Sequence, residues 1–210
     1  MSQDRFDQLT AHFLGLSWKV CEDRHVVSGT LYPFEFHSPR EVAIATFAND
    51  WHNLTCNGGL IYPNYKSRVF KEVTQEVDTV VPRGYTFEMH VFSNGRHPLF
   101  YSVDPIINPL RCKGLPHLYL HSPIEVLPGI TTVPLCVYPP HDTDWKPLTD
   151  SFDKPLAWLS HWFARFAIWQ KTNIWFGHIS SHDPTYIAKH FSRGLCWCGL
   201  PNSMNECRHV

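Results

Sequence analysis

The 210-residue sequence lacks an excess of charge of either sign, long apolar runs and a recognisable secretion signal. Its 18 Lys and Arg residues nearly balance 19 Asp and Glu residues, which gives a formal net charge of −1. Such a chain has no overall field to attract a phosphate backbone or an anionic membrane, so we expect no nucleic-acid partner. No apolar run approaches about 18 residues, and no basic segment followed by an apolar one occurs near the start. We therefore expect a cytoplasmic protein without a membrane partner.

The sequence also lacks the composition of a disordered chain and the motif of a nucleotide-activating enzyme. Hydrophobic residues make up 43% and aromatic residues 14%, including eight Trp, so a chain of this size can bury a core. No Gly-rich phosphate loop follows a predicted strand, so we expect no adenylation of a carboxyl group by this chain alone. Seven cysteines are an odd number, which favours thiol chemistry or metal binding over a disulfide framework.

The periodicity predicts helices at both ends of a strand-rich region. Apolar positions in residues 3–16 recur at helical spacing, and "VVSGTLYPFEF" is typical of a strand. "YTFEMHVF" and "LFYSV" predict a hairpin, joined by "SNGRHP", whose Asn94-Gly95 pair suits the positive backbone angles of a tight turn. Residues 37–83 mix apolar pieces with Asn, Gly and Pro and give no clear element.

Prolines punctuate residues 104–155, so this segment is predicted to be mostly loop, interrupted by the extended run "VPLCVY". The following segment, 155–171, is apolar on nearly every face and predicts a largely buried helix that begins near its proline. Its three tryptophans lie on one stripe, which is typical of core packing: Trp158, Trp162 and Trp169.

Cys136 stands in the extended run, and two interpretations compete for it. A cysteine in an apolar segment is commonly a small buried hydrophobic residue. A cysteine is also a strong nucleophile as its thiolate and is suited to hold an acyl group as a thioester. Composition does not decide between these interpretations, but the order of the surrounding motifs favours the second.

Four short motifs follow one another in the sequence: "GTLYP", "PHLY", "PLCVY" and "DWKP", the last just before the aromatic helix. This order resembles the bacterial ubiquitin-conjugating-enzyme-like family of CBASS-type antiphage defence operons. Eukaryotic relatives of that family carry a His-Pro-Asn motif, a Gly-x-Ile-Cys-Leu segment and a Trp-Ser-Pro motif in the corresponding places. The resemblance covers roughly residues 84–182, together with "SGTLYP" near the start.

The resemblance implies an α+β fold of the ubiquitin-conjugating type, in which an antiparallel strand meander is flanked by helices. The expected domain spans residues 1–190, with 37–83 as a candidate insertion. The implied activity is an acyl transfer: Cys136 accepts the C-terminal carboxyl group of a protein as a thioester and passes it to a lysine. The implied partners are a cyclic-oligonucleotide-producing nucleotidyltransferase of the same operon or a ubiquitin-like protein, with a separate activating enzyme or direct capture of an acyl donor.

The sequence departs from the eukaryotic pattern at the oxyanion-stabilising position, because no Asn follows the His-containing motif. Removal of one oxyanion donor costs a factor of about 10²–10³ in rate, so another polar group is expected in its place. His117 is the first candidate, followed by His121 and His141. The alternative is that His117 only hydrogen-bonds backbone within an irregular segment.

The segment around "DWKP" offers one acid–base candidate and two structural residues. Asp144, or its neighbour Asp142, could orient or deprotonate an incoming lysine, although a solvated acidic loop is the more ordinary explanation of both residues. Trp145 and Pro147 are expected to be structural: the indole closes the loop and its N–H finds an acceptor.

The last 20 residues, 191–210, carry four candidate ligands with the spacing of a zinc knuckle: Cys196, Cys198, Cys207 and His209. The spacing resembles the small zinc motif at the C-terminus of the bacterial preprotein translocase motor, with the fourth ligand displaced by one position. A structural zinc would supply the folding energy of such a tail. Uncoordinated thiols or an artefactual disulfide are the alternatives, and the pair His178 and His182 is a weaker metal candidate.

Two further functions compete with the conjugating enzyme. The same fold could act as a catalytically inert scaffold that grips the nucleotidyltransferase or a ubiquitin-like protein. Alternatively, Cys136 with a nearby histidine could form a cysteine hydrolase, which requires a base oriented by a third group. Only the conjugating enzyme and the hydrolase need a reactive thiol at Cys136.

Overall fold

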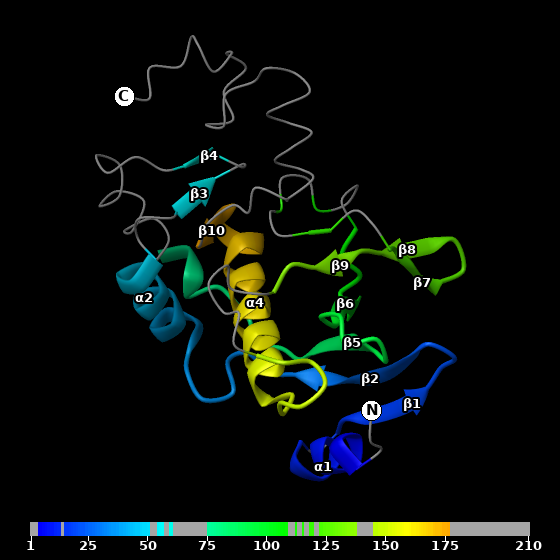
Figure 1. Ribbon diagram of the computed structural model, residues 1–210. Coiled ribbons are helices and arrows are strands. Elements are labelled where there is room, and N and C mark those ends of the chain that lie inside the picture. Colours follow the sequence, from blue (N-terminus) through cyan, green and yellow to red (C-terminus); the bar gives the residue numbers. More distant parts are fainter. Residues whose placement is uncertain are drawn as a thin grey trace, which may run out of the picture. The chain divides into compact units, whose positions relative to one another are not determined.

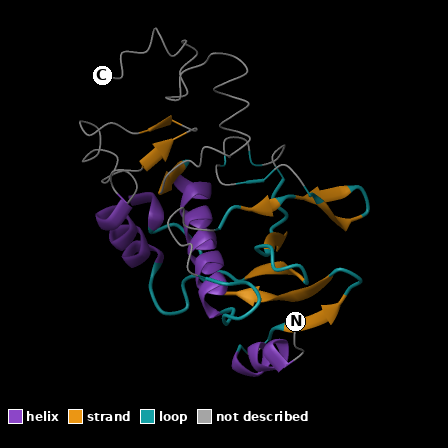
Figure 2. Ribbon diagram, in the orientation of Figure 1, coloured by secondary structure: helices purple, strands orange, loops and turns teal. Residues whose placement is uncertain are grey.

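The computed structural model describes residues 4–13, 15–50, 54–56, 59–60, 75–108, 112, 115, 118–119, 122–137 and 145–176 (Figure 1). The chain divides into two compact units. The first consists of Met1–Tyr32, Gly84–Arg111 and Tyr119–Trp162, and the second of Pro33–Arg83, Cys112–Leu118 and Phe163–Val210. Helices and antiparallel strands occur together (Figure 2), an architecture compatible with the expected ubiquitin-conjugating fold. No helix within the described ranges is both long and apolar enough to cross a membrane.

The first unit is built on a five-stranded antiparallel sheet. Its strands lie in the order β1-β2-β5-β6-β9, with these bounds: β1 Ser17–Val20, β2 Arg24–Leu31, β5 Tyr85–Phe92, β6 Leu99–Asp104 and β9 Pro134–Leu135. The predicted hairpin of β5 and β6 is confirmed. The strand expected from "VVSGTLYPFEF" is shorter than predicted and ends at Leu31, because Pro33 has no N–H with which to continue a ladder.

The turn between β5 and β6 follows a different geometry from the tight two-residue turn that Asn94-Gly95 suggested. Six residues, 93–98, separate the strands, and only Gly95 of the pair has a positive φ, +78°. The Gly95 N–H donates to the carbonyl oxygen of Phe92 at 3.3 Å, and the Arg96 N–H donates to Asn94 Oδ1 at 3.2 Å. The Asn side chain therefore shapes the turn by accepting a hydrogen bond.

Both predicted helices are present. Helix α1 spans Asp4–His12, and α4 spans Asp153–Thr172, starting two residues before the proline that was expected to open it. Pro155 is tolerated in the first turn because the backbone N–H groups of a first turn have no acceptor within the helix, so the missing N–H of a proline breaks no helical hydrogen bond. At the other end, Asn173 adopts φ +55° and its N–H donates to the carbonyl oxygen of Trp169 at 2.8 Å, which terminates the helix.

The segment 37–83, which gave no clear element, contains helix α2, Pro39–Asp50. A capping box opens it: the Ser38 N–H donates to Glu41 Oε2 at 2.7 Å, and the Glu41 N–H donates to Ser38 Oγ at 3.2 Å. The "SPRE" sequence carries this signal. The second unit also has a three-stranded antiparallel sheet in the order β10-β3-β4, formed by Ile174–Phe176, Leu54–Cys56 and Gly59–Leu60.

The prediction of mostly loop for residues 104–155 missed a second hairpin of the first unit. Strands β7, Ile124–Leu127, and β8, Ile130–Thr132, pair in antiparallel fashion around a turn in which Gly129 has φ +71°. The hairpin escapes a proline-based argument because the intervening "IEVLPGITT" combines β-branched residues with a Pro-Gly turn. The Thr132 hydroxyl anchors the hairpin to the segment that follows β6, because it donates to the carbonyl oxygen of Ile107 at 2.8 Å.

Candidate functional site

Cys136 lies immediately after the edge strand β9. Pro134 pairs with Tyr101 and Leu135 pairs with Phe100, so β9 runs antiparallel to β6. Because β6 begins at Leu99, Cys136 leaves the sheet at the end that carries the β5–β6 turn. The expected extended run is therefore confirmed for Pro134 and Leu135, the two residues just before Cys136.

The Cys136 side chain is nearly covered: only 6% of its surface is exposed. Its chain neighbours Leu135 and Val137 are buried as well, at 1% and 8%. The thiol must gain access to solvent or to a partner before it reacts.

Tyr119, the last residue of the motif "PHLY", is hydrogen-bonded to the same strand. The Tyr119 N–H donates to the carbonyl oxygen of Pro134 at 2.8 Å, two residues before Cys136. The strand that leads to Cys136 is thus hydrogen-bonded on one side to β6 and on the other to Tyr119. Tyr119 and Pro134, which come from two separate motifs of the sequence, therefore lie side by side within the first unit.

Trp145, the first residue of the Trp-Lys-Pro motif, is 3% exposed and its indole N–H donates to the carbonyl oxygen of Ser151 at 2.8 Å. The expected hydrogen bond of the indole is therefore confirmed. Its ring packs edge-on against Trp158 of α4 with 6.2 Å between ring centroids, and it lies 5.9 Å from the ring of His97. Since His97 belongs to the β5–β6 turn, Trp145 and Cys136 lie at the same end of the sheet.

Residues 146–150 form a compact turn that we call the Trp145 loop. The Lys146 N–H donates to Asp150 Oδ2 at 2.7 Å, and the Asp150 N–H donates to the carbonyl oxygen of Lys146 at 3.0 Å. The first of these bonds, together with one from the Thr149 hydroxyl, lowers the pKa of the Asp150 carboxyl group. A carboxylate at Asp150 therefore closes the loop at neutral pH.

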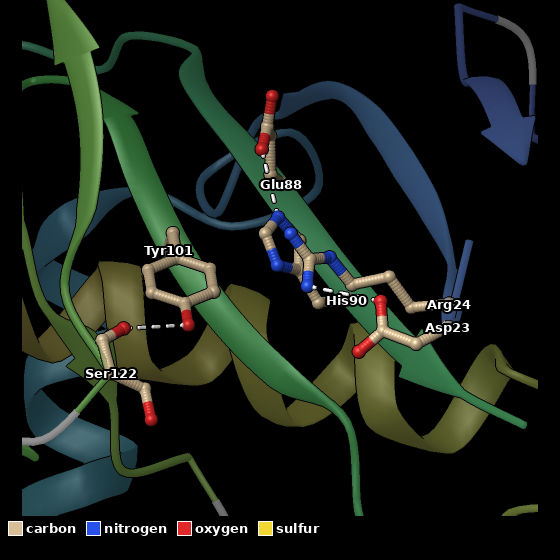
Figure 3. Close-up of polar contacts among 6 residues, drawn as sticks. All are labelled: Asp23, Arg24, Glu88, His90, Tyr101 and Ser122. Atoms are coloured by element: carbon tan, nitrogen blue, oxygen red, sulfur yellow. Dashed lines mark hydrogen bonds and ion pairs between the residues drawn. The ribbon is translucent and has the colours of Figure 1, made fainter. Parts of the chain in front are cut away.

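A polar cluster on the sheet lies around Tyr101, the residue of β6 that pairs with Pro134 (Figure 3). The sequence did not predict this cluster. Glu88 Oε2 and His90 Nε2 lie 2.9 Å apart on β5, and the His90 ring lies 4.6 Å from the Tyr101 ring. The Tyr101 hydroxyl donates to the carbonyl oxygen of Ser122 at 2.9 Å. The signal in the sequence is the spacing of Glu88 and His90, two apart on one strand, which places both side chains on one face.

Electrostatics fix the ionisation of this cluster. The hydrogen bond between Glu88 and His90 is the main reason that the pKa of Glu88 is lowered. Burial raises the pKa of Tyr101 to about 12, so the phenol remains protonated and donates its hydrogen bond throughout the neutral range. The hydrogen bond from Tyr101 therefore anchors Ser122, which precedes β7, to β6. Strand β6 is the strand that pairs with β9, just before Cys136.

The remaining predicted site residues lie outside the described residues. They are His117, His121, His141, Asp142, Asp144, His178, His182, Cys196, Cys198, Cys207 and His209, and the domain boundary at residue 190 lies there too. Within the described ranges, no group of three or more His, Cys, Asp or Glu side chains is arranged to hold a metal ion.

Residues 61–183 match the model of the family described as "Type II CBASS E2 protein". The match covers more than half of the chain and includes β5, β6, β9, Cys136, the Trp145 loop and α4. Neither the curated proteins nor the solved structures give a significant match.

Proposed function

Because the chain belongs to the Type II CBASS E2 protein family, we propose that it is a conjugating enzyme that carries a protein C-terminus as a thioester on Cys136. The enzyme then transfers that C-terminus to a lysine amine in antiphage defence. The observation that carries the proposal is the position of Cys136: it lies within the family match and directly follows β9, the strand that is hydrogen-bonded to both β6 and Tyr119.

The chemistry proceeds in two acyl transfers. In the first, the Cys136 thiolate attacks the carbonyl carbon of an activated C-terminal carboxyl group, and the bond to the activating group breaks as the C–S bond forms. In the second, a neutral lysine amine attacks the thioester carbonyl, the C–N bond forms and the Cys136 thiolate leaves. A base accepts the proton that the amine loses.

We assign the oxyanion-stabilising role to His117, with His121 as the second choice. What supports this is chain connectivity: His117 precedes by two residues Tyr119, whose N–H is bonded to Pro134. Asp144, adjacent to the buried Trp145, is the proposed acceptor of the lysine proton.

The proposed partners follow from the family. They are proteins of the same operon: a cyclic-oligonucleotide-producing nucleotidyltransferase that is modified or regulated, or a ubiquitin-like protein that is carried. Since the sequence has no Gly-rich phosphate loop, a separate activating enzyme or a preactivated acyl donor supplies the activated carboxyl group. The C-terminal knuckle of Cys196, Cys198, Cys207 and His209 is proposed to bind a structural zinc ion.

The burial of Cys136 favours one alternative function, a catalytically inert scaffold of the same fold. A thiol that is 6% exposed serves equally well as a packing residue. In that case the protein would bind the nucleotidyltransferase or a ubiquitin-like protein without forming any covalent adduct.

Intact-protein mass spectrometry distinguishes the two functions. The chain is purified from a host that expresses its operon neighbours and is analysed under denaturing, non-reducing conditions, beside Cys136→Ala and Cys136→Ser. The conjugating enzyme predicts a protein-sized adduct that thiol treatment removes, that Cys136→Ala lacks and that Cys136→Ser holds as a thiol-resistant ester. Copurification of one partner with all three forms, without any adduct, would instead establish the scaffold.

A further inference from the structure

Arg5 of α1 binds three backbone carbonyl groups of the Trp145 loop. Its Nη1 donates to the carbonyl oxygen of Pro147 at 3.1 Å and to that of Leu148 at 2.7 Å, and its Nη2 donates to the carbonyl oxygen of Asp150. These contacts join residues more than 140 positions apart in the sequence. A planar guanidinium fork suits such a multiple contact, which a lysine ammonium cannot reproduce with the same geometry.

Helix α1 is itself fixed on the sheet, so Arg5 holds the loop from a rigid position. The neighbouring residue Phe6 is fully buried and stacks on His25 of β2, with 4.4 Å between centroids and 5° between planes. Phe6 also lies 5.4 Å from Phe152, and the Arg5 guanidinium lies 4.7 Å above that same Phe152 ring. The aromatic contacts therefore join α1, β2 and the residue just before α4.

The opposite side of the Trp145 loop meets the β5–β6 turn. A Cβ atom added at Gly95 would lie 3.0 Å from a methyl carbon of Leu148, so the turn and the loop are in close contact. The internal hydrogen bonds of Lys146 and Asp150 give the loop its shape, whereas Arg5 and Gly95 fix its position between α1 and the turn. That turn is at the end of the sheet where Cys136 leaves β9.

We propose that Arg5 is a positioning residue, which holds the Trp145 loop against the Cys136 end of the sheet and thereby controls access to the Cys136 thiol. The consequence for catalysis rests on the proposed function: the same contact would place the loop for entry of the lysine amine. Loss of Arg5 would leave the loop closed by its own hydrogen bonds but free to move away from the β5–β6 turn, at the end of the sheet where Cys136 lies. Access to the thiol would then increase without unfolding of the chain.

The test measures alkylation of individual cysteines in the native protein, with iodoacetamide and peptide mapping by mass spectrometry. Cys21, half-buried before β2 in the same unit, is the internal reference. In Arg5→Ala, the Cys136-to-Cys21 rate ratio should rise about tenfold or more, because the loop loses its charge-assisted hydrogen bonds to Arg5. Arg5→Lys should give an intermediate ratio, because a cation remains but the fork is lost.

The matched control is Arg40→Ala, which removes an exposed ion pair with Asp78, 2.6 Å long, from the other unit. Its ratio should equal that of the wild type. Equal acceleration of Cys136 and Cys21 in Arg5→Ala would show general loosening and overturn the proposal, as would an unchanged ratio. If Arg5→Ala does not fold, Arg5→Lys decides alone: an unchanged ratio in that variant overturns the proposal.

Because alkylation needs no modifier protein, this result stands apart from the proposed function. Where a loaded thioester is obtained, its discharge to free lysine in a single turnover should slow in Arg5→Ala while the yield of loading is unchanged. A protein that never forms an adduct would refute the conjugating activity and leave the alkylation result valid. An altered alkylation ratio with normal discharge would confine the role of Arg5 to thiol access.

Discussion

The indole N–H of Trp145 donates to the carbonyl oxygen of Ser151 over 2.8 Å, and this bond closes the loop of residues 145–151 that precedes α4. Trp145→Phe keeps most of the ring packing and leaves that carbonyl without its donor. We expect a loss of about 1–2 kcal/mol in the free energy of unfolding, measured by urea denaturation. Trp18→Phe is the matched control, because the Trp18 indole donates to Asp7 Oδ1 at 3.3 Å at an exposed site. An equal loss in both variants would show that the buried hydrogen bond of Trp145 stabilises the protein no more than the exposed one of Trp18.

Gly95 and Leu148 determine how closely the β5–β6 turn approaches the Trp145 loop. In Gly95→Ala, the added Cβ meets Leu148 and a non-glycine residue must adopt φ +78°. The backbone term alone costs about 1–2 kcal/mol. Gly129→Ala isolates that term, since Gly129 has φ +71° and no heavy atom within 4 Å of the added Cβ. Thermal unfolding should show a larger loss for Gly95→Ala, and equal losses would refute the close contact.

The Glu88–His90 contact predicts an acid-dependent part of the stability. The hydrogen bond with His90 lowers the pKa of Glu88 in the folded state, so the folded protein releases that proton more readily than the unfolded chain. The resulting stabilisation is fully present above the unfolded pKa of about 4.3 and is lost as the pH falls through the lower folded pKa.

Glu88→Gln removes this titration. The difference in unfolding free energy between wild type and Glu88→Gln should be largest above about pH 5 and shrink towards pH 3. Chemical denaturation at a series of pH values measures it. A difference that grows as the pH falls would show that Glu88 prefers to be protonated in the folded protein, contrary to the direction derived from His90.

The elements that the sequence predicted correctly are those whose signal is local. Phe6 and Leu9 at helical spacing mark α1, and the alternation in "YTFEMHVF" marks β5. Helix α2 was missed although Ser38 and Glu41 form a capping box, because its apolar residues do not gather on one face. The capping residues Ser38 and Glu41 are therefore the local signal for α2, and hydrophobic periodicity is not.

The contacts of the candidate site could not be predicted in the same way. The sequence indicated that Trp145 would close its loop with a hydrogen-bonded indole, since a large aromatic ring packs against the protein and its N–H then needs an acceptor. The bonds from Arg5 to Pro147 and Leu148 depend on where α1 packs, and no local pattern encodes contacts over 140 residues. The pairing of Tyr119 with Pro134 likewise arises from tertiary structure alone.

The cysteine-rich tail predicts one zinc ion for each chain. Inductively coupled plasma mass spectrometry of the reduced, desalted protein should give a zinc-to-protein ratio near one, and Cys198→Ser should lower it strongly, because the knuckle then has three ligands. Cys21→Ser, which changes a cysteine outside the tail, should retain the metal. A wild-type protein without zinc would refute the knuckle and favour uncoordinated thiols.

His117 is predicted to stabilise the oxyanion that forms when lysine attacks the thioester. His117→Ala should slow single-turnover discharge of the loaded protein by about 10²–10³-fold, the usual cost of one lost oxyanion donor, with little effect on the stability of the fold. His117→Asn, which restores an amide donor near this position, should recover part of the rate.

His121→Ala serves as the control for loss of a neighbouring imidazole. If His121→Ala is slow and His117→Ala is not, the role belongs to His121. If neither variant slows discharge, the donor lies elsewhere and the proximity of Tyr119 to Pro134 serves only to hold the strand that leads to Cys136.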